Sequence, residues 1–337
     1  MSRTIVILTE GGQRIGLGHV SRCAALASAF KAHGARIKFV LRGDETALAF
    51  LESQGFRGHF FDWEEDLVQT KDLVSESKVV VVDSYTAELP FYNWLSTKVS
   101  QLLVLDDFFR LPYPETAFIL NPVAEPDGNP FHLFGLQYAL LRPAFWEVPE
   151  REVRDEVYRV LITFGGEDLR NLTPLAVSVV REVFPEAECA VVVGPAFADQ
   201  NVVEGGQVKI YRHLPAEEMR DLMLASDLAV SAGGQTLFEL LRTGTPTVAI
   251  LTAENQRANV DRLRGLGLIL KAGDYEEVDL TRGITKSLAC LRNKSRREDL
   301  SRKAVKSVDG KGCHRLCSKL CDNRTIRGVG GIKKYIK

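Results

Sequence analysis

The 337-residue sequence has no excess of charge of either sign and no long apolar run. Lys and Arg number 43 and Asp and Glu number 44, which gives a formal net charge of -1. A chain without net positive charge has no general attraction to nucleic acid or to anionic lipid. It also lacks any run of about eighteen apolar residues, and no signal-like segment precedes residues 4–10. These absences predict a cytoplasmic protein that binds no nucleic acid and has no stable membrane association.

Cysteine is also scarce, with six residues in the whole chain. Six scattered thiols are too few to form a disulfide framework in a chain of this length. Three of them, Cys313, Cys317 and Cys321, recur at every fourth position, with His314 beside the first. Zinc ligands usually come in pairs about two to four residues apart around a turn, with a second pair elsewhere. We therefore predict that these thiols pack on the inner face of a terminal helix, and we predict no metal and no cofactor.

Short apolar runs with the length of buried strands alternate with helix-like stretches along the chain. The first series covers residues 4–10, 36–42, 78–84, 101–107, 117–122 and 138–143. The second series covers residues 159–168, 187–195, 208–214, 226–234, 245–253 and 267–273, and a helix-like stretch follows each run. In the first series, helical patterns occupy residues 20–33 and 45–55. Alternation of this kind predicts open parallel sheets that are covered by helices on both faces.

A charged stretch at residues 146–159 interrupts the pattern and predicts a connection with a short helix. The length of the chain also exceeds what one hydrophobic core usually serves. We therefore predict an α/β protein with two doubly wound domains and a cleft between them. The first domain is predicted to span residues 1–148 and the second residues 149–325, and the basic residues 326–337 are predicted to form a tail.

The loop after the first predicted strand has the glycines of a phosphate cradle. Gly16 and Gly18 permit close backbone approach, and the helix that follows would aim its N-terminal amides at an anion. The loop is not a dinucleotide fingerprint, because Ser21 stands where the third glycine is required. His19 lies in the first turn of the helix, where an imidazole can act as a general base near neutral pH. Its position alone equally permits a role that only covers the loop.

Polar residues also follow two later strands of the first series. Tyr85 can pack on a sugar face and donate a hydrogen bond. Asp83 is as well suited to structural capping as to substrate contact. Asp106 and Asp107 follow the strand at 101–107, and we predict that both only cap a helix. In open α/β sheets ligands gather beyond the carboxyl ends of the strands, so these loops are candidate binding loops.

The second series has two loops of small residues. Gly165 and Gly166 leave a strand and suit a phosphate, whereas the pattern alone predicts only helix capping for Asp168 and Asn171. Residues 231–236 form a second strand-to-helix turn, followed one turn later by Glu239. A carboxylate there can accept hydrogen bonds from a ribose diol or simply favour the helix dipole. Asn255 and Gln256 follow the predicted strand at 245–253 and offer neutral side-chain amides at the same edge of the sheet.

Six stretches, taken in order, resemble one family. They are "IGLGHVSRC" (15–23), "VVDSY" (81–85), "YALLRPAF" (138–145), "FGGEDLRNLT" (164–173), "SAGGQTLFELL" (231–241) and "ENQRANVDRL" (254–263). Together they are similar to the UDP-sugar hydrolases of the pseudaminic acid pathway and to their spore-coat polysaccharide relatives. The likeness covers nearly the whole chain. It implies the GT-B architecture, in which two Rossmann-like domains flank a cleft and the second holds most of the nucleotide.

The resemblance also implies a reaction and a set of site residues. The reaction is hydrolysis of UDP-2,4-diacetamido-2,4,6-trideoxy-β-L-altropyranose to the free sugar and UDP. The family's catalytic histidine corresponds to His19, which favours catalysis over loop covering at this position. The residues predicted to bind substrate are Gly16, Gly18, Arg22, Tyr85, Gly165, Gly166, Asp168, Asn171, Ser231, Ala232, Gly233, Gly234, Gln235, Thr236, Glu239, Asn255 and Gln256.

The mechanism expected from this resemblance needs one base and no metal. His19 takes a proton from a water that attacks the anomeric carbon, and UDP leaves from the opposite face with inversion. Backbone amides at two helix N-termini stabilise the departing diphosphate. Two alternatives remain open, namely a GT-B glycosyltransferase that uses a UDP-sugar donor and a non-catalytic nucleotide-sugar-binding protein. The three cysteines near the C-terminus depart from the resemblance.

Overall fold

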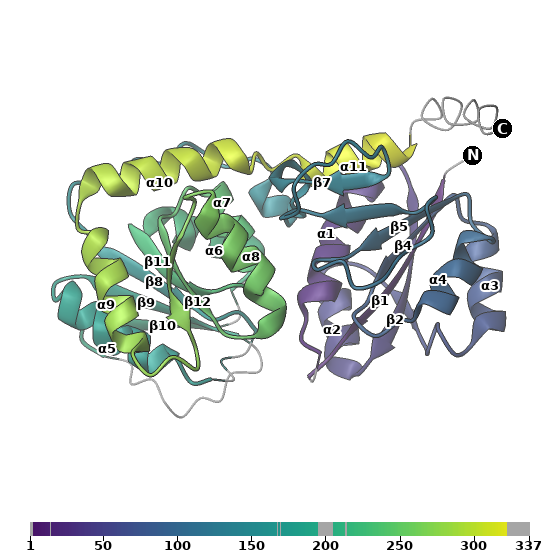
Figure 1. The fold of residues 1–337 in the computed structure, drawn as a ribbon. Helices are drawn as coiled ribbons and strands as arrows, with labels where there is room; N and C mark the ends of the chain where they lie inside the picture. Colours follow the sequence, from purple (N-terminus) through teal and green to yellow (C-terminus); the bar gives the residue numbers. More distant parts are fainter. Residues whose placement is uncertain are drawn as a thin grey trace.

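The computed structural model describes residues 3–13, 15–166, 168, 170–194, 205–212 and 214–321, which form two α/β halves (Figure 1). The first half contains a seven-stranded parallel sheet of order β3-β2-β1-β4-β5-β6-β7. Its strands are β1 (Thr4–Gly11), β2 (Arg36–Gly43), β3 (Gly58–Phe60), β4 (Val79–Asp83), β5 (Gln101–Leu105), β6 (Phe118–Asn121) and β7 (His132–Phe134). Its helices are α1 (Gly18–Ala32), α2 (Glu45–Ser53), α3 (Leu67–Ser75) and α4 (Leu89–Ser96), with 3₁₀ turns η1 (Leu136–Tyr138) and η2 (Pro143–Phe145).

The second half contains a six-stranded parallel sheet of order β10-β9-β8-β11-β12-β13. Its strands are β8 (Arg159–Thr163), β9 (Glu188–Val193), β10 (Val208–Arg212), β11 (Leu228–Ala232), β12 (Thr247–Leu251) and β13 (Leu270–Asp274). The helices from here to the C-terminus are α5 (Thr173–Val183), α6 (Ala216–Ala225), α7 (Thr236–Arg242), α8 (Arg257–Gly265), α9 (Leu280–Cys290), α10 (Lys294–Ser307) and α11 (Gly312–Cys321), with the turn η3 (Glu254–Gln256).

Alternation along the buried strands places apolar side chains on both faces of each sheet. In β1, Ile5 and Ile7 pack with the α1 side of the first sheet, whereas Val6 and Leu8 pack with the α3 and α4 side. Successive side chains of a strand point to opposite faces, so a strand that is apolar throughout requires a covering layer on each face. The two sheets are covered in this way, as the predicted fold class requires.

Some predicted elements differ in the structure. Residues 138–143 were predicted as a strand, but they form parts of η1 and η2 and an irregular segment between them. The proline at position 143 begins η2, and the chain there leaves the first sheet for the second half. The short edge strands β3 and β7 were not predicted. The short helix predicted in residues 146–159 is absent, because residues 149–158 contain only irregular backbone and bends. The predicted helix between β9 and β10 falls mostly outside the described residues.

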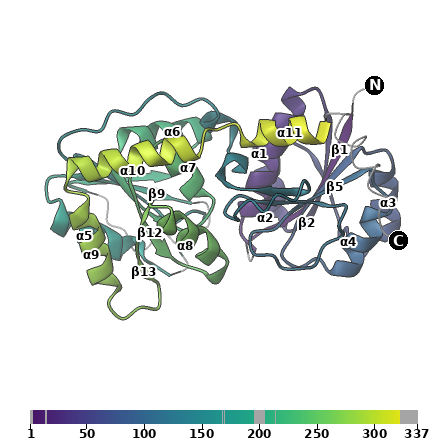
Figure 2. The same cartoon turned by 45° about the horizontal axis from the view of Figure 1, so that its top comes forward.

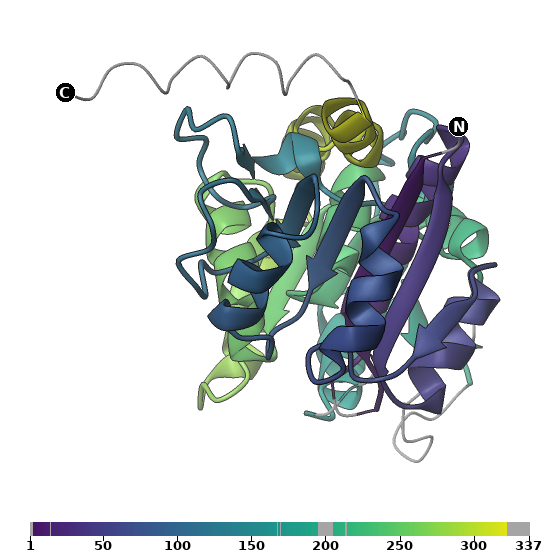
Figure 3. The ribbon, with the colours of Figure 1, turned by 90° about the vertical axis from the view of Figure 1, so that its right-hand side faces the viewer.

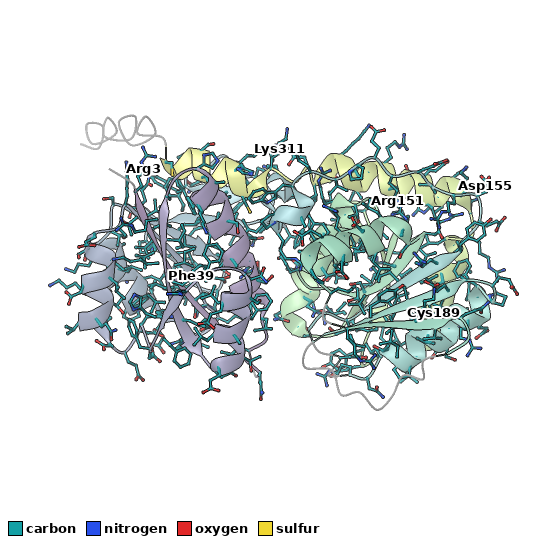
Figure 4. All side chains as sticks on the ribbon, turned by 180° about the vertical axis from the view of Figure 1, so that it is seen from behind. Arg3, Phe39, Arg151, Asp155, Cys189 and Lys311 are labelled. Carbon is teal, nitrogen blue, oxygen red and sulfur yellow. The ribbon has the colours of Figure 1, made fainter. Side chains whose placement is uncertain are left out.

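The last described helix does not belong to the half that precedes it in the sequence. In Figure 2, α10 lies over the second half while α11 lies over the first, and Figure 3 shows the yellow helix above the sheet of the first half. The inner face of α11, with Leu316 and Leu320, is buried in the same core as α1. Arg3 donates a hydrogen bond to the Cys321 carbonyl, and Figure 4 shows Arg3 near this end of the helix. The predicted second domain of residues 149–325 therefore includes a helix that packs on the first, and the predicted tail of residues 326–337 lies outside the described residues.

The structure confirms that thiols pack on the inner face of this terminal helix. Cys313 and Cys317 are fully buried, and burial raises the pKa of Cys313 to about 12. A thiol with such a pKa stays protonated and behaves as a small apolar group. None of the helices in the described part of the chain is long and apolar enough to cross a membrane.

We predict that Leu316→Ala destabilises the first half by about 2–5 kcal/mol, because it leaves a cavity in the core beneath α11. The three tryptophans, Trp63, Trp94 and Trp146, all precede β8, so the tryptophan fluorescence transition in urea reports on the first half and its junction. Ser318→Ala on the exposed side of α11 is the control. An unchanged midpoint in Leu316→Ala would contradict the docking of α11.

Candidate active site

The loops that follow β1, β4 and β5 come together because these strands are neighbours in the first sheet. The loop after β1 folds back on itself through two backbone hydrogen bonds between Gly12 and Gly16, of 3.2 and 2.7 Å. Both residues have positive φ angles, of 147° and 82°, which glycine adopts without a steric penalty. The loop joins β1 to α1, and His19 lies in the first turn of α1.

His19 is buried, with 4% of its surface exposed, and its Nδ1 lies 2.6 Å from Oδ1 of Asp83 at the end of β4. Burial would raise the pKa of Asp83, but Arg22 and His19 hold that pKa well below its usual range, so Asp83 is ionised. An ionised carboxylate only accepts hydrogen bonds, and Nδ1 of His19 therefore carries the proton. In the neutral imidazole this leaves a lone pair on Nε2, which is buried without a hydrogen-bond partner among the described residues.

Arg22 joins Asp83 to a second carboxylate. Its Nε and Nη2 donate to the two oxygens of Asp83 at 2.6 Å each, and its Nη1 donates to Asp107 at 2.9 and 2.7 Å. Arg22 follows His19 by three residues on α1, so both side chains lie on one face of the helix. Arg22 was predicted to bind substrate, but its guanidinium nitrogens are engaged by these two carboxylates.

Tyr85 completes this group of side chains. Its ring lies edge-on against the ring of His19, with centroids 4.1 Å apart, and its hydroxyl donates to Asp107 at 3.0 Å. Burial raises the pKa of Tyr85 and Asp107 raises it further, so the phenol remains protonated. Asp107 was predicted to cap a helix, and that prediction is wrong because its carboxylate holds Arg22 and Tyr85. Asp106 instead accepts the backbone amides of Phe108 and Arg110, in a turn rather than at a helix terminus.

Glu10 supports the loop after β4 and was not identified from the sequence. It is fully buried near the end of β1 and accepts hydrogen bonds from the side chains of Arg42 at 2.6 Å and Ser84 at 2.8 Å, and from the Tyr85 amide at 2.7 Å. Burial would raise the pKa of Glu10, but Arg42 and these other donors lower it. Its one sequence signal was a charged residue that ends an apolar strand. Glu10 fixes the backbone from which the Tyr85 side chain extends.

In the second half, Asp168 has the capping role that its pattern alone predicted. Its carboxylate accepts the backbone amides of Leu172 and Thr173 at 2.9 and 2.7 Å at the start of α5. Asn171, which lies between Asp168 and Leu172 in the sequence, has a positive φ of 50°. Gly165 and Gly166 are exposed after β8, and a Cβ on Gly194 would lie 2.3 Å from the Gly166 carbonyl oxygen. Close backbone packing therefore shapes this loop.

The turn of residues 231–236, from the end of β11 to the start of α7, is held by α8 and the residues just before it. The Gly233 amide donates to Oε1 of Gln256 at 2.9 Å, and Asn259 donates to the Gly233 carbonyl at 3.2 Å. A Cβ on Gly233 would lie 2.4 Å from a Val260 methyl carbon, so only glycine fits. Gln256 therefore supports the loop, while the Asn255 side chain is exposed beside it.

Three other loop residues, Gly234, Gln235 and Thr236, have backbone amides with no acceptor among the described residues. Ser231 and Ala232 precede them and are buried. Adjacent amides without acceptors can bind an anion.

Glu239 is buried on α7 and pairs with an arginine that the sequence analysis did not single out. Nε of Arg142 lies 2.6 Å from Oε1 of Glu239, and Nη2 lies 2.9 Å from Oε2. Burial would lower the pKa of Arg142, but Glu239 raises it. A cavity of about 1030 Å³ is lined by Pro143, Trp146 and His314 among others, but not by Arg142 or Glu239. None of the predicted site residues lines that cavity.

Comparison with known proteins relates the chain to sugar metabolism. It is 25% identical over 278 residues to the pseudaminic acid cytidylyltransferase and UDP-2,4-diacetamido-2,4,6-trideoxy-β-L-altropyranose hydrolase of Helicobacter pylori, covering 79% of this chain and 48% of that protein. It is 23% identical to the spore coat polysaccharide biosynthesis protein SpsG of Bacillus subtilis, covering 94% and 97%. An uncharacterised protein of Methanocaldococcus jannaschii is 25% identical, covering 76% and 57%. The chain thus spans only about half the length of two of these relatives, and no protein-family profile matches it.

Solved structures establish the fold as GT-B. LpCGTa in complex with UDP superimposes with a TM-score of 0.68 at 14% identity, covering 96% of this chain and all of that one. MurG of Acinetobacter baumannii superimposes with a TM-score of 0.67 at 13% identity, covering 95% and 99%. At such identities the likeness concerns the fold alone. Two parallel-sheet α/β halves with the GT-B arrangement therefore carry the two groups of loops described above.

We predict that Glu10→Gln lowers the free energy of unfolding by about 2–4 kcal/mol at neutral pH, because the charge that holds Arg42 is lost. A carboxyl with a lowered folded-state pKa stabilises the protein above its unfolded pKa, and this stabilisation is lost as the pH falls through the folded pKa. The gap between wild type and variant should therefore narrow below about pH 4.5, the ordinary pKa of Glu. Urea unfolding across pH measures it, and Glu76→Gln in the exposed pair with Lys38 is the control. A gap that is constant with pH would contradict the assignment.

Proposed function

We propose that this protein hydrolyses a UDP-sugar to the free sugar and UDP, with His19 as the general base. The observation that carries the proposal is the hydrogen bond between Nδ1 of His19 and the ionised Asp83, which leaves Nε2 as an unpaired acceptor. A buried polar atom without a partner is costly and is concentrated at functional sites. Glu, Asp or Lys would not supply a neutral base of this kind near pH 7.

The proposed step balances with one water and one base. Nε2 takes a proton from the water as its oxygen attacks the anomeric carbon, and the bond from that carbon to the diphosphate oxygen breaks. The electron pair leaves with UDP, which needs little protonation, so no second acid is assigned. Attack opposite the leaving group inverts the anomeric centre. Because Nε2 is buried, the side chains around it must shift slightly to admit the water.

The second half is proposed to hold the UDP group without a metal. The amides of Gly234, Gln235 and Thr236 and the exposed Gly165 and Gly166 are suited to the diphosphate, whose charge grows as it leaves. Glu239 is proposed to accept the ribose hydroxyls, and Asn255 to contact the nucleotide at the rim. Support comes from the LpCGTa structure, which is a complex with UDP.

The sugar is proposed to be the diacetamido-trideoxy altropyranose named for the Helicobacter pylori relative. The second candidate function is glycosyl transfer from a UDP-sugar to an acceptor other than water. It is favoured by the spinosyn rhamnosyltransferase SpnG, which superimposes with a TM-score of 0.65 at 16% identity over 92% of this chain. The two functions differ in whether UDP is released when no acceptor is present.

The test incubates purified protein with a panel of UDP-diacetamido-trideoxyhexoses and measures UDP release without an acceptor. Hydrolysis predicts release by the wild type and a loss of about 10²–10⁴-fold in kcat for His19→Ala, with UDP affinity retained. His33→Ala at the exposed end of α1 is the matched control and should keep full activity. Release that requires an added acceptor would favour the transferase, and normal turnover by His19→Ala would refute the base.

Asp83→Asn tests the role of the carboxylate behind His19. We expect kcat to fall by about 10²–10⁴-fold with UDP affinity unchanged, because an amide no longer fixes the Nδ1–H tautomer. Asp107→Asn removes the other carboxylate from Arg22 without touching His19, so its loss in kcat should be smaller by about tenfold. Thermal unfolding of both variants checks that they fold. Equal losses in kcat would indicate that the ion pairs with Arg22 matter and the tautomer does not.

A further inference from the structure

The segment of residues 139–146, here called the crossover, joins the two halves and is anchored in both. Leu140 is buried in the core of the first half, whereas Leu141 and Phe145 are buried in the core of the second. The backbone at Leu140 and Leu141 therefore passes directly from one core to the other. Any group bound to this backbone is positioned relative to both halves.

One face of α7 and the residue before it hold the crossover. The positions Gln235, Glu239 and Arg242 are spaced by four and three residues, so their side chains lie on one side of the helix. Gln235 donates to the Leu140 carbonyl. Arg242 donates to the carbonyls of Phe145 at 3.1 Å and Trp146 at 3.2 Å. Glu239 lies between these two residues on α7, and it binds the one charged side chain of the crossover.

That side chain is Arg142, and its geometry constrains the carboxylate tightly. The two nitrogen–oxygen contacts of 2.6 and 2.9 Å form a fork on both oxygens of Glu239, an arrangement that fixes the plane of the carboxylate as well as its position. The guanidinium also lies over the Phe145 ring at 5.4 Å. The Glu239 side chain is 6% exposed and that of Arg142 is 22% exposed, so the pair is poorly screened by water.

The fork uses only part of the hydrogen-bonding capacity of the Glu239 carboxylate. A carboxylate has about four lone-pair positions on its two oxygens, and Arg142 occupies one on each. One position on each oxygen remains, which matches the two hydroxyls of a ribose diol. A carboxylate whose plane is already fixed loses little side-chain entropy when it binds those hydroxyls. Glu239 can thus hold Arg142 and a ribose together.

We propose that Arg142 is a positioning residue for the nucleotide, holding the Glu239 carboxylate in the orientation that accepts the ribose hydroxyls. This proposal rests on the proposed function, in which Glu239 binds ribose. It adds that the ribose contact is tied to the crossover between the halves. Ribose recognition in the second half then depends on a side chain of the connecting segment.

The segment that leads from α10 back to the first half also passes close to the crossover. Gly310 precedes α11 with a positive φ of 82°, and a Cβ there would lie 2.4 Å from the Trp146 carbonyl oxygen and 2.9 Å from Nε of Arg242. Figure 4 shows the neighbouring Lys311 at the junction of the two halves. Both connections between the halves therefore meet beside α7, which limits how far the crossover can move away from Glu239.

Calorimetric titration with UDP and with 2′-deoxy-UDP tests the proposal. The wild type should bind UDP about tenfold or more tightly than 2′-deoxy-UDP, because the missing hydroxyl leaves a buried acceptor unpaired. In Arg142→Gln the ratio of the two affinities should fall toward one. Arg142→Lys, which retains the charge without the fork, should give a ratio between these values. Glu239→Gln should abolish the ratio, and adding Arg142→Gln to it should change the ratio no further.

Arg220→Gln is the matched control. Arg220 also donates to a crossover carbonyl, that of Ala144 at 3.3 Å, but it lies on α6, and its variant should keep the wild-type ratio. An Arg142→Gln variant that preserves the wild-type ratio, whether or not both affinities fall, would overturn the positioning role. If Arg142→Gln does not fold by circular dichroism, Arg142→Lys alone decides by the same ratio. A wild type that binds neither nucleotide would instead refute the proposed function.

Discussion

The buried carboxylate of Asp83 is the interaction on which the first half of the site depends. It ends a strand without any exposed surface, where an unpaired charge would be strongly destabilising. Arg22 and His19, one helical turn apart on α1, both reach it. Because Arg22 satisfies the charge, the carboxylate stays ionised, and because it is ionised, the proton of His19 stays on Nδ1. A single ion pair therefore determines which imidazole nitrogen keeps an unshared lone pair.

The two halves of the molecule contribute different chemistry. The first presents ionisable side chains that are oriented by one another, namely His19, Asp83 and Tyr85 with Asp107 behind them. The second presents mainly backbone amides, in a turn where a Cβ on Gly233 would clash with Val260. Fixed amides stabilise charge without a proton transfer of their own. This division is the one that the proposed reaction needs, with a base at one end of the bond that breaks and a departing anion at the other.

The strands and most helices could be predicted from the sequence because the apolar runs are buried on both faces and need covering layers. β3 and β7 were missed because each has only three residues, too few to show a period. Residues 138–143 looked like a strand because the crossover is buried in both cores and is therefore as apolar as a strand. The half on which α11 packs was not predictable either, since the amphipathic pattern of a helix does not indicate which sheet it covers.

For the site, the sequence could identify the loops but not the pairings within them. His19 and Tyr85 were identified by their place after strands and by resemblance. The roles of Asp107, Glu10 and Arg142 depend on partners that are distant in the chain. Arg142 and Glu239, for example, are separated by 97 positions. Local sequence patterns do not indicate which distant residues pair in this way. Capping by Asp168 was predictable because its partners are four and five residues away.

The docking of α11 has a consequence for biosynthesis. The strands and helices of the second half run from β8 to α10, and its core residues, crossover included, have all been translated once residue 308 is reached. The core of the first half includes Leu316, Cys317 and Leu320, which are among the last described residues to leave the ribosome. The half that is synthesised first is therefore the later one to complete its packing. Until then the apolar side of α1 that α11 covers has no covering helix.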